Sequence, residues 1–394
     1  MQNFQYYTPT KVVFGRETEL QTGSLIQENN CKKVLVHYGG GSVKKSGLLN
    51  RICKSLEACG ISYITLGGVV PNPHLSLVYE GIELCKKEAV DFILALGGGS
   101  VIDSAKAIGY GVTNSGDVWD FYEGKRKANA CLPIGVILTI AAAGSEMSDS
   151  SVITKEDGGI KRGYSSDFAR PKFAVMNPEL TMTLPEYQTM SGCVDIMMHT
   201  MERYLNRVDN MELTDGISEH LIRTVMKNAK LLMRDPKNYN ARAEVMWAGS
   251  LSHNGLTGCG TDGGDWATHQ IEHELGGMFD VAHGAGLAAV WGSWARYVVS
   301  ERQERFAAFA VKVMGVPEMS SETETALKGI EAMEEFYRSV NMPTSLKQLG
   351  IEPTEEQMRE MAEKCSFWGE RTIGCVKALD QDDIYQIYRK AAEL

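Results

Sequence analysis

Three of the eight histidines in the chain lie within the stretch DWATHQIEHELGGMFDVAHGAG, residues 265–286. His269 and His273 are four residues apart, so on a helix both would project from the same face. The glycine pairs at 263–264 and 276–277 predict a helix that begins near Asp265 and ends before His283, which would then lie in a loop. Imidazoles grouped in this way can bind a transition metal or exchange protons near neutral pH.

A second pair with the same spacing, Asp195 and His199, occurs in SGCVDIMMHTMERYL. Together with the later histidines it makes a set of one carboxylate and three imidazoles. Such a set suits Zn²⁺ or Fe²⁺ better than Mg²⁺ or Ca²⁺, because the latter two prefer oxygen ligands. The spacing does not decide which of the three later histidines are ligands. The alternative is that these are separate histidines with structural roles.

Two predicted strands each run into a glycine-rich turn. VLVHYGGGSVKKSG places Gly39–Ser42 ahead of Lys44 and Lys45, and VDFILALGGGSVIDSAKAIGYG places Gly97–Ser100 ahead of a helix with Asp103 and Lys106. Neither spacing is the G-x-G-x-x-G fingerprint or a Walker loop. Glycines let a backbone approach a phosphate, and a helix start attracts negative charge. Two such turns at the carboxyl ends of parallel strands predict a dinucleotide site, with plain strand-to-helix turns as the alternative.

The residues after the first of these strands favour NADP(H) over NAD(H). Sites for NAD usually place an Asp or Glu at a strand end, where it binds the ribose hydroxyls. Here small residues occupy that place, and Ser42, Lys44 and Lys45 follow. A carboxylate would repel the additional phosphate of NADP(H), so its absence favours that cofactor. The alternative for the two lysines is a solvated helix start.

The elements that must position these residues fall into two halves. From Lys11 to about Asn177, short β-rich runs alternate with amphipathic helical stretches, which predicts a parallel, Rossmann-like sheet covered on both faces. The expected strands are KVVFG, KKVLVHY, ISYITLGG, VDFILALGG, IGVILTI and KFAVMNP. Thr183 and Glu186 predict a capping box, with Pro185 in the first turn, at the start of a region with no convincing strand. We therefore expect an α/β dinucleotide-binding domain at 1–184 and an all-helical metal-binding domain at 185–394.

The composition is that of an ordinary globular chain of 394 residues, 43% hydrophobic and 23% charged. A net charge of -10 without a block of Lys or Arg argues against nucleic acid or an anionic membrane as a partner. The first twenty residues lack the apolar core of a signal peptide, and the longest uncharged run is too short to span a bilayer. We therefore expect a cytoplasmic protein whose partner is a small molecule.

Taken together, these motifs resemble the iron-containing (group III) alcohol dehydrogenase family, and within it the butanol dehydrogenase branch. The resemblance runs from YYTPTKVVFG nearly to the C-terminus. It includes YGGGSVKKSG, VVPNP, LGGGSVIDSAKAI, LTIAAAGSEMS, the pair Asp195 and His199, and the pair His269 and His273 followed by AHGAG. It implies a dehydroquinate-synthase-like fold with the active site in the cleft between the halves. Relatives are often dimers, so it also implies a homodimer.

The resemblance further implies roles for individual residues. Asp195, His199, His269 and His283 match the metal ligands of the family, and His273 matches a histidine that faces the nicotinamide and the substrate. The positions that contact the cofactor are Gly39, Gly40, Ser42, Asn72, Gly98, Gly99, Ser100, Asp103, Thr139, Ser148 and Lys161. Members that prefer NAD(H) tend to carry an acid where this chain has Gly39 or Gly40. Ala143 stands where relatives often have Thr, which puts a side-chain contact to the cofactor there in question.

We therefore expect a metal-dependent alcohol dehydrogenase or aldehyde reductase, with Fe²⁺ or Zn²⁺, acting on short aliphatic alcohols and aldehydes such as butanol and butyraldehyde. Trp266, Met278, Phe279 and Tyr164 could line an apolar substrate pocket, with core packing as the alternative. A first alternative function is a metal-dependent lyase or polyol-phosphate dehydrogenase. It would need several Lys or Arg beside the metal, where only Arg203 is near in sequence. A second is a non-catalytic metal or nucleotide sensor.

Overall fold

The computed structural model describes residues 1–393, which pack as two compact units. The α/β unit is Tyr7–Thr183, and the helical unit combines Met1–Tyr6 with the described residues from Leu184 onward. The first six residues were expected in the α/β domain, whereas they pack with the helical unit. Gln2, for example, donates its backbone N–H to the carbonyl oxygen of Gly260 at 2.9 Å.

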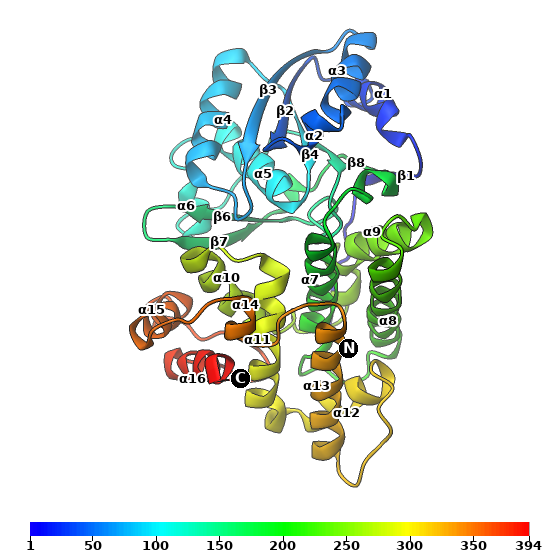
Figure 1. Cartoon of the computed structure of the whole chain (residues 1–394). Helices are drawn as coiled ribbons and strands as arrows, with labels where there is room; N and C mark the ends of the chain where they lie inside the picture. Colours follow the sequence, from blue (N-terminus) through cyan, green and yellow to red (C-terminus); the bar gives the residue numbers. More distant parts are fainter. Residues whose placement is uncertain (394) are drawn as a thin grey trace. The chain divides into compact units, whose positions relative to one another are not determined.

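A six-stranded parallel sheet forms the centre of the α/β unit, in the order β1-β8-β5-β4-β2-β3 (Figure 1). Its strands are β1 (Lys11–Phe14), β2 (Lys33–Gly39), β3 (Ser62–Val69), β4 (Phe92–Gly97), β5 (Ile134–Leu138) and β8 (Phe173–Met176). All six predicted strands are confirmed. β4 is buried along its whole length, and such burial on both faces explains its continuous apolar sequence.

Helices pack on both faces of this sheet. They are α1 (Thr22–Gln27), α2 (Ser42–Lys45), α3 (Leu48–Ala58), α4 (Leu75–Glu88), α5 (Gly99–Thr113) and α6 (Trp119–Tyr122). Leu48, Ile52 and Leu56 recur every four residues on α3 and are buried in the hydrophobic core on one face. On the opposite face, His37 of β2 reaches α5, where its Nε2 lies 2.9 Å from Ser104 Oγ.

The strand order brings the two glycine-rich turns together. β2 lies between β3 and β4. The chain therefore runs from β2 to the edge strand β3 and then crosses back to β4, on the opposite side of β2. Because the strands are parallel, the turns after β2, β4 and β5 lie at the same carboxyl edge. The backbone N–H of Thr139 donates to the carbonyl oxygen of Gly97 at 3.0 Å, which joins the ends of β5 and β4. A reversal of strand order of this kind is the usual position of a ligand site in open parallel sheets.

An antiparallel hairpin of β6 (Ser150–Lys155) and β7 (Ile160–Ser165) was not predicted from the sequence. Its turn contains Gly158 and Gly159, both with positive φ, which is typical of hairpin turns. The hairpin lies beside the turn after β3, where Thr154 donates its N–H to the Pro73 carbonyl oxygen at 2.8 Å. It thereby carries Lys161 toward the carboxyl edge of the sheet.

The helical unit contains no strand in the part that the structure describes, apart from a single bridge between Ile373 and Leu379, as the sequence predicts. Its helices are α7 (Glu186–Tyr204), α8 (Glu212–Arg234), α9 (Tyr239–His253), α10 (Ala267–Phe279), α11 (His283–Val298), α12 (Gln303–Lys312), α13 (Glu322–Ser339), α14 (Leu346–Leu349), α15 (Glu355–Cys365) and α16 (Gln381–Glu393). α7 is buried from Thr189 to Tyr204, because α8, α9 and α11 pack around it (Figure 1).

The last part of the described chain is tied to α10 by hydrogen bonds. Asp265 lies two residues before this helix and is buried. One of its carboxylate oxygens accepts from the backbone N–H groups of Cys375 at 2.8 Å and Val376 at 2.7 Å. Tyr388 of α16 donates its hydroxyl to the carbonyl oxygen of Ile271 at 2.7 Å. The C-terminal segment therefore helps to hold α10 in place.

Three helix boundaries differ from those predicted. Pro185 is the N-cap of α7 and no side chain caps this helix, so the predicted capping box of Thr183 and Glu186 is wrong. α10 begins after Trp266, which has a φ of 62°, and continues through the glycines at 276–277 to Phe279. His283 is the first residue of α11 rather than part of a loop. α10 and α11 are buried in the unit, and this packing outweighs the helix-ending tendency of the glycine pair at 276–277.

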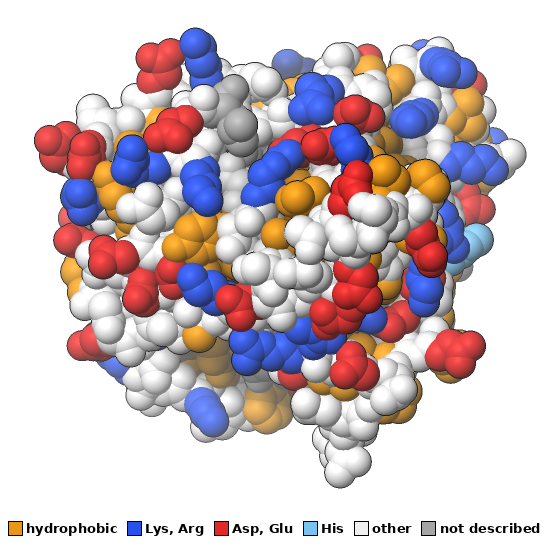
Figure 2. All heavy atoms as spheres, turned by 90° about the horizontal axis from the view of Figure 1, so that it is seen from below, with side chains coloured by type: hydrophobic (Ala, Val, Ile, Leu, Met, Phe, Trp, Pro, Cys, Tyr) orange, Lys and Arg blue, Asp and Glu red, His pale blue; other side chains and the backbone are white. Residues whose placement is uncertain are grey.

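Acidic and basic side chains alternate on the surface shown in Figure 2, with apolar side chains between them. That face therefore carries no continuous basic surface of the kind that binds nucleic acid. No helix of residues 1–393 combines the length and the apolar character needed to cross a membrane.

Candidate metal and dinucleotide sites

Asp195, His199, His269 and His283 come together inside the helical unit. Asp195 and His199 lie one turn apart on α7, His269 lies on α10, and His283 opens α11. Oδ1 of Asp195 faces a nitrogen of each imidazole: Nδ1 of His199 at 3.3 Å, Nε2 of His269 at 3.7 Å and Nε2 of His283 at 3.6 Å. The first three residues are nearly inaccessible to solvent, whereas the His283 side chain is 27% exposed.

The atoms that face one another in this cluster are chemically suited to a cation. Asp195 Oδ1, His199 Nδ1 and His269 Nε2 are buried, and none makes a hydrogen bond within the described chain. Buried polar atoms normally have a partner, so three converging atoms without one need an explanation. Carboxylate oxygen and imidazole nitrogen are the ligands preferred by Zn²⁺ and Fe²⁺, and these three residues lie close enough to share one ion.

Two buried glutamates that the sequence reasoning missed hold the histidine rings. Oε1 of Glu202 accepts from Nδ1 of His269 at 3.1 Å and from its backbone N–H at 3.0 Å. Glu272 accepts from Nδ1 of His283 through Oε2. In both cases the carboxylate takes the proton-bearing Nδ1, which leaves Nε2 as the nitrogen that faces Asp195. Carboxylates in this position typically orient histidines that bind metals.

The buried titratable groups of this cluster shift one another's pKa values. Burial raises the pKa of the Asp195 carboxyl, but His199, His283 and His269 outweigh this effect, so the pKa is held below its usual range. Burial, with His253 next, lowers the pKa of His199 well below that of a free imidazole, which keeps His199 neutral and able to bind metal. For His269, burial lowers the pKa, but the nearby carboxylates of Asp195 and Glu202 outweigh this effect and raise the pKa to about 9.

A second layer of side chains packs against His199, and one of its members, His253, was not predicted from the sequence. The ring centroid of His253 lies 4.1 Å from that of His199, and the indole of Trp266 contacts His199, His253 and His269. Arg203 lies over Trp266 and donates to the carbonyl oxygens of His199 at 2.8 Å and Ser252 at 2.9 Å. Arg203 is buried and engaged in this layer, so it does not present a cationic site for a phosphorylated substrate.

His273 lies one turn after His269 on α10, and its ring centroid is 5.9 Å from that of His283. It is buried, with 8% of its surface exposed. The structure therefore places it beside His283 of the four-residue cluster. This position is compatible with a role in proton exchange next to a metal site.

The predicted cofactor residues all lie in the α/β unit, and most follow the carboxyl ends of strands. Gly39 is the last residue of β2, Gly40 and Ser42 follow it, Asn72 follows β3, Gly98, Gly99 and Ser100 follow β4, Asp103 is on α5, Thr139 and Ser148 follow β5, and Lys161 is on β7. A Cβ added to Gly40 would meet no atom within 4 Å, whereas one added to Gly99 would lie 2.8 Å from Cβ of Ala143. Gly40 therefore leaves bare backbone that a phosphate or ribose could approach closely, whereas the lack of a side chain at Gly99 lets the segment after β5 pack against the start of α5.

Two of the predicted cofactor residues make contacts within the α/β unit. The Asp103 carboxylate accepts from Ser145 Oγ at 2.6 Å and from the Val152 N–H at 2.9 Å. Ser148 is buried, with its hydroxyl 3.4 Å from Lys106 Nζ.

Tyr164, considered above as a pocket residue, packs with Tyr110, Phe121 and Tyr122, and its hydroxyl accepts from the Ala128 N–H.

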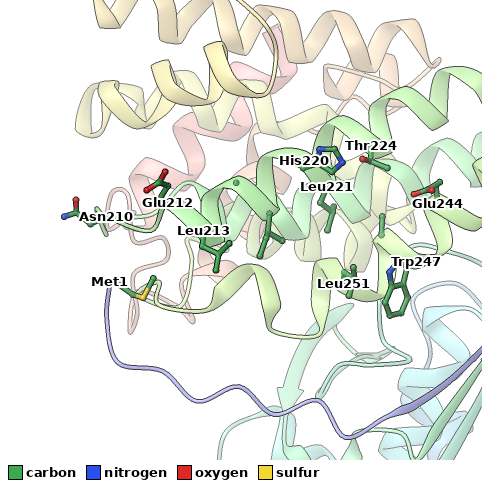
Figure 3. A pocket seen from close by; sticks show the side chains of 13 residues that line it. Met1, Asn210, Glu212, Leu213, His220, Leu221, Thr224, Glu244, Trp247 and Leu251 are labelled. Atoms are coloured by element: carbon green, nitrogen blue, oxygen red, sulfur yellow. The ribbon is translucent and has the colours of Figure 1, made fainter.

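A separate groove of about 890 Å³ lies between α8 and α9 (Figure 3). Its apolar lining includes Met1, Leu213, Leu221, Trp247 and Leu251. None of the predicted metal or cofactor residues lines it in the described chain. The groove is therefore not the candidate site, although it is a prominent hollow of the helical unit.

The chain has close relatives among known proteins. A family model described as iron-containing alcohol dehydrogenase matches residues 9–178, and one for the C-terminal region of the Fe-containing alcohol dehydrogenase family matches 189–392. The chain is 40% identical to the probable NADH-dependent butanol dehydrogenase 1 of Bacillus subtilis, with 99% of each chain covered. It is 33% identical to the NADPH-dependent aldehyde reductase YqhD of Escherichia coli, covering 89% of this chain and 90% of that one.

A solved structure is similarly close. The crystal structure of NADH-dependent butanol dehydrogenase A from Thermotoga maritima superposes with a TM-score of 0.96 at 40% identity, over 100% of this chain and 99% of that one. Full-length similarity in sequence and in fold agrees with the matches of both family models. The chain belongs to the iron-containing alcohol dehydrogenase family.

Proposed function

We propose that this protein is a metal-dependent alcohol dehydrogenase or aldehyde reductase that transfers a hydride between NADP(H) and short aliphatic alcohols or aldehydes, such as butanol and butyraldehyde. The observation that carries the proposal is the convergence of Asp195, His199, His269 and His283 around buried atoms suited to a cation. The relatives named as butanol dehydrogenases and as an aldehyde reductase support the substrate class.

In this proposal the four converging residues hold one divalent ion, Fe²⁺ or Zn²⁺. A cation held there would act as a Lewis acid toward the oxygen of the alcohol or aldehyde. Glu202 and Glu272 orient the rings of His269 and His283, and the rings of Trp266 and His253 pack against His199. The bare backbone at the carboxyl edge of the sheet would bind the dinucleotide, whose nicotinamide supplies or takes up the hydride.

His273 is the proposed site of proton exchange. An imidazole changes charge near neutral pH, so its ring nitrogen can take up or release the proton that accompanies hydride transfer. We expect His273→Ala to slow turnover by roughly 10²- to 10⁴-fold, the usual contribution of general acid–base catalysis. Bound metal, measured by elemental analysis, should stay nearly unchanged. A parallel loss of metal would show instead that His273 is a ligand.

The preference for NADP(H) rests on the residues after β2. Gly39 and Gly40 carry no carboxylate, and the exposed Lys44 and Lys45 follow. The names of the relatives divide on this point, since the butanol dehydrogenases are described as NADH-dependent and the aldehyde reductase as NADPH-dependent. The comparison of kcat/KM for NADPH and NADH with butyraldehyde decides the preference.

One assay tests the proposed activity. The purified protein, reconstituted separately with Fe²⁺ and Zn²⁺, is incubated with butyraldehyde and NADPH or NADH while the near-ultraviolet absorbance of the reduced nicotinamide is followed. We expect consumption of the cofactor that depends on metal and is lost in His269→Ala, together with bound metal. His220→Ala provides the matched control, because His220 lines the groove between α8 and α9. Absence of turnover with either cofactor and either metal would contradict the proposal.

We also propose a homodimer, by analogy with relatives. Sedimentation velocity of the metal-loaded protein measures its mass against the 43.4 kDa of one chain. A species of one chain mass at micromolar concentration would contradict this expectation.

A further inference from the structure

Lys106 is a lysine with no exposed surface in the middle of α5. Its ammonium lies among five oxygens of one segment: Ser145 O at 2.8 Å, Ser145 Oγ at 2.9 Å, Ser148 O at 3.0 Å, Ser148 Oγ at 3.4 Å and Ser150 O at 2.7 Å. An ammonium has only three N–H groups to donate, so the five oxygens share them. The oxygens therefore surround Lys106 Nζ in the way that ligands surround a small cation. Burial lowers the pKa of Lys106 to about 8, while Asp103, Asp149 and Glu146 favour its charged form.

Asp103 binds the same segment from one turn earlier on α5. Its Oδ1 accepts from Ser145 Oγ at 2.6 Å, and its Oδ2 accepts from the N–H of Val152 at 2.9 Å. Residues three apart on a helix project to one side, so the carboxylate and the ammonium act on the segment together. Burial of a charged group costs free energy unless its partners are well placed. An apolar side chain would fill the place of Lys106 without this cost, so packing alone does not explain a lysine there.

The segment held in this way continues from the end of β5 and packs on the start of α5. A Cβ added to Gly98 would lie 2.8 Å from Cβ of Ile140, and one added to Gly99 would lie 2.8 Å from Cβ of Ala143. Residues 139–149 contain no helix or strand, so side chains rather than a regular backbone ladder determine much of their path. The segment thus forms a wall directly beside the glycine turn of the proposed dinucleotide site.

We propose that Lys106, assisted by Asp103, is a positioning residue for the dinucleotide. Its ammonium is an internal cation around which residues 145–150 fold. The preceding residues 139–143 are thereby held in the conformation that lets the cofactor bind. The inference rests on the proposed function, because it assumes that the carboxyl edge of the sheet binds NADP(H). It gives Asp103 and Ser148 an additional role, because both contact partners that fix the path of the segment.

The test compares NADPH binding in Lys106→Met with that of the parent protein, by the fluorescence of the bound reduced nicotinamide. Loss of charge-assisted hydrogen bonds that position the site should raise the Kd for NADPH about tenfold or more. Ile108→Ala is the matched control. Ile108 is equally buried on α5, but its side chain packs against Gly81 of α4, so the variant loses stability without touching the segment. Its Kd should stay within about twofold of the parent value.

Two further measurements separate positioning from a general loss of structure. Metal content should be unchanged in Lys106→Met, since the candidate metal ligands belong to the helical unit. In Lys106→Ala, added ethylammonium should lower the Kd again by occupying the vacated place, whereas tetramethylammonium, which donates no hydrogen bond, should not. If Lys106→Met is insoluble, Ser145→Ala provides the same comparison, because the Ser145 hydroxyl contacts both Lys106 Nζ and Asp103 Oδ1.

The outcomes distinguish this inference from the proposed function. An equal Kd in Lys106→Met and the parent protein would overturn the inference alone. The same result would follow if Ile108→Ala raised the Kd as much as Lys106→Met, because the effect would then reflect stability. If the parent protein itself binds neither NADPH nor NADH, the proposed function fails first.

Discussion

At the scale of single residues, two glutamates decide how the histidines of the helical unit present their nitrogens. Glu202 and Glu272 each follow a predicted metal ligand by three residues, namely His199 and His269, yet each binds a histidine from another segment. The four-residue spacing of Asp195 and His199 was visible in the sequence because it depends only on one helix. The glutamate pairings could not be predicted in this way, since they depend on which helices meet.

Replacement of Glu202 by Gln should weaken metal binding. The amide can no longer accept both hydrogen bonds of His269 with a full negative charge, so the ring loses orientation and basicity. Changes of this type typically cost about 10- to 100-fold in metal affinity. Competition with a chelator of known affinity measures the Kd for Zn²⁺. Glu334→Gln is the control, because this buried carboxylate binds Arg296 instead of a histidine. An equal loss of affinity in both variants would contradict the assigned role.

Replacement of Gly40 by Asp should move the cofactor preference toward NADH. The position has space for a side chain, since an added Cβ meets no atom within 4 Å. A carboxylate there would repel the additional phosphate of NADPH and could bind the free ribose hydroxyls of NADH. We expect the ratio of kcat/KM for NADPH to that for NADH to fall by about tenfold or more. Gly40→Asn, which matches Asp in size without its charge, should change the ratio much less.

At the scale of elements, the parallel sheet was predictable and the hairpin was not. Strands such as β4 are continuous apolar runs bounded by glycine, and burial on both faces produces that pattern. β6 and β7 are partly polar, and the hairpin depends on pairing between them and on the neighbouring turn after β3. In α10, the stop signal at 276–277 failed because packing of the helix outweighed the roughly 1 kcal/mol that each glycine costs in a helix.

The contact between β2 and α5 predicts a loss of stability in acid. His37 donates through Nδ1 to the Leu66 carbonyl oxygen at 2.9 Å, so its Nε2, 2.9 Å from Ser104 Oγ, accepts. Burial lowers the pKa of His37 to about 4, although the bond to Leu66 opposes this. As the pH falls below about 6.5, His37 becomes protonated in the unfolded chain, whereas in the folded chain it stays neutral until about pH 4. Stability should therefore fall across this window, by roughly 3 kcal/mol at most.

Thermal unfolding of the parent protein and of His37→Gln between pH 7 and pH 4 measures this effect. Gln keeps a hydrogen-bonding side chain but does not titrate. We expect the parent Tm to decline more steeply than that of the variant. Parallel declines would show that other groups account for the acid sensitivity.

At the scale of the whole molecule, the candidate metal links α7 to the consecutive helices α10 and α11, which come much later along the chain. An ion that binds only the folded helical unit stabilises it by mass action, by about 3 kcal/mol at a free concentration of 100 times Kd. Removal of the metal with a chelator should therefore lower the Tm of this unit by roughly 5–10 °C, and added Zn²⁺ should restore it. Asp195→Ala should show the lower Tm without treatment and no response to chelator. An unchanged parent Tm after verified metal loss would contradict the proposed site.

The attachment of the C-terminal segment to α10 has a practical consequence for handling the protein. Loss of the residues after a proteolytic cut before residue 373 would remove the two backbone N–H groups that donate to Asp265 and the Tyr388 hydroxyl that donates to Ile271. The buried Asp265 carboxylate, just before the helix that bears His269, would then lack these hydrogen bonds. A nicked preparation could thus fail to retain its ion while every candidate ligand is still present. Intact-mass spectrometry should precede any judgement that an inactive sample lacks the activity.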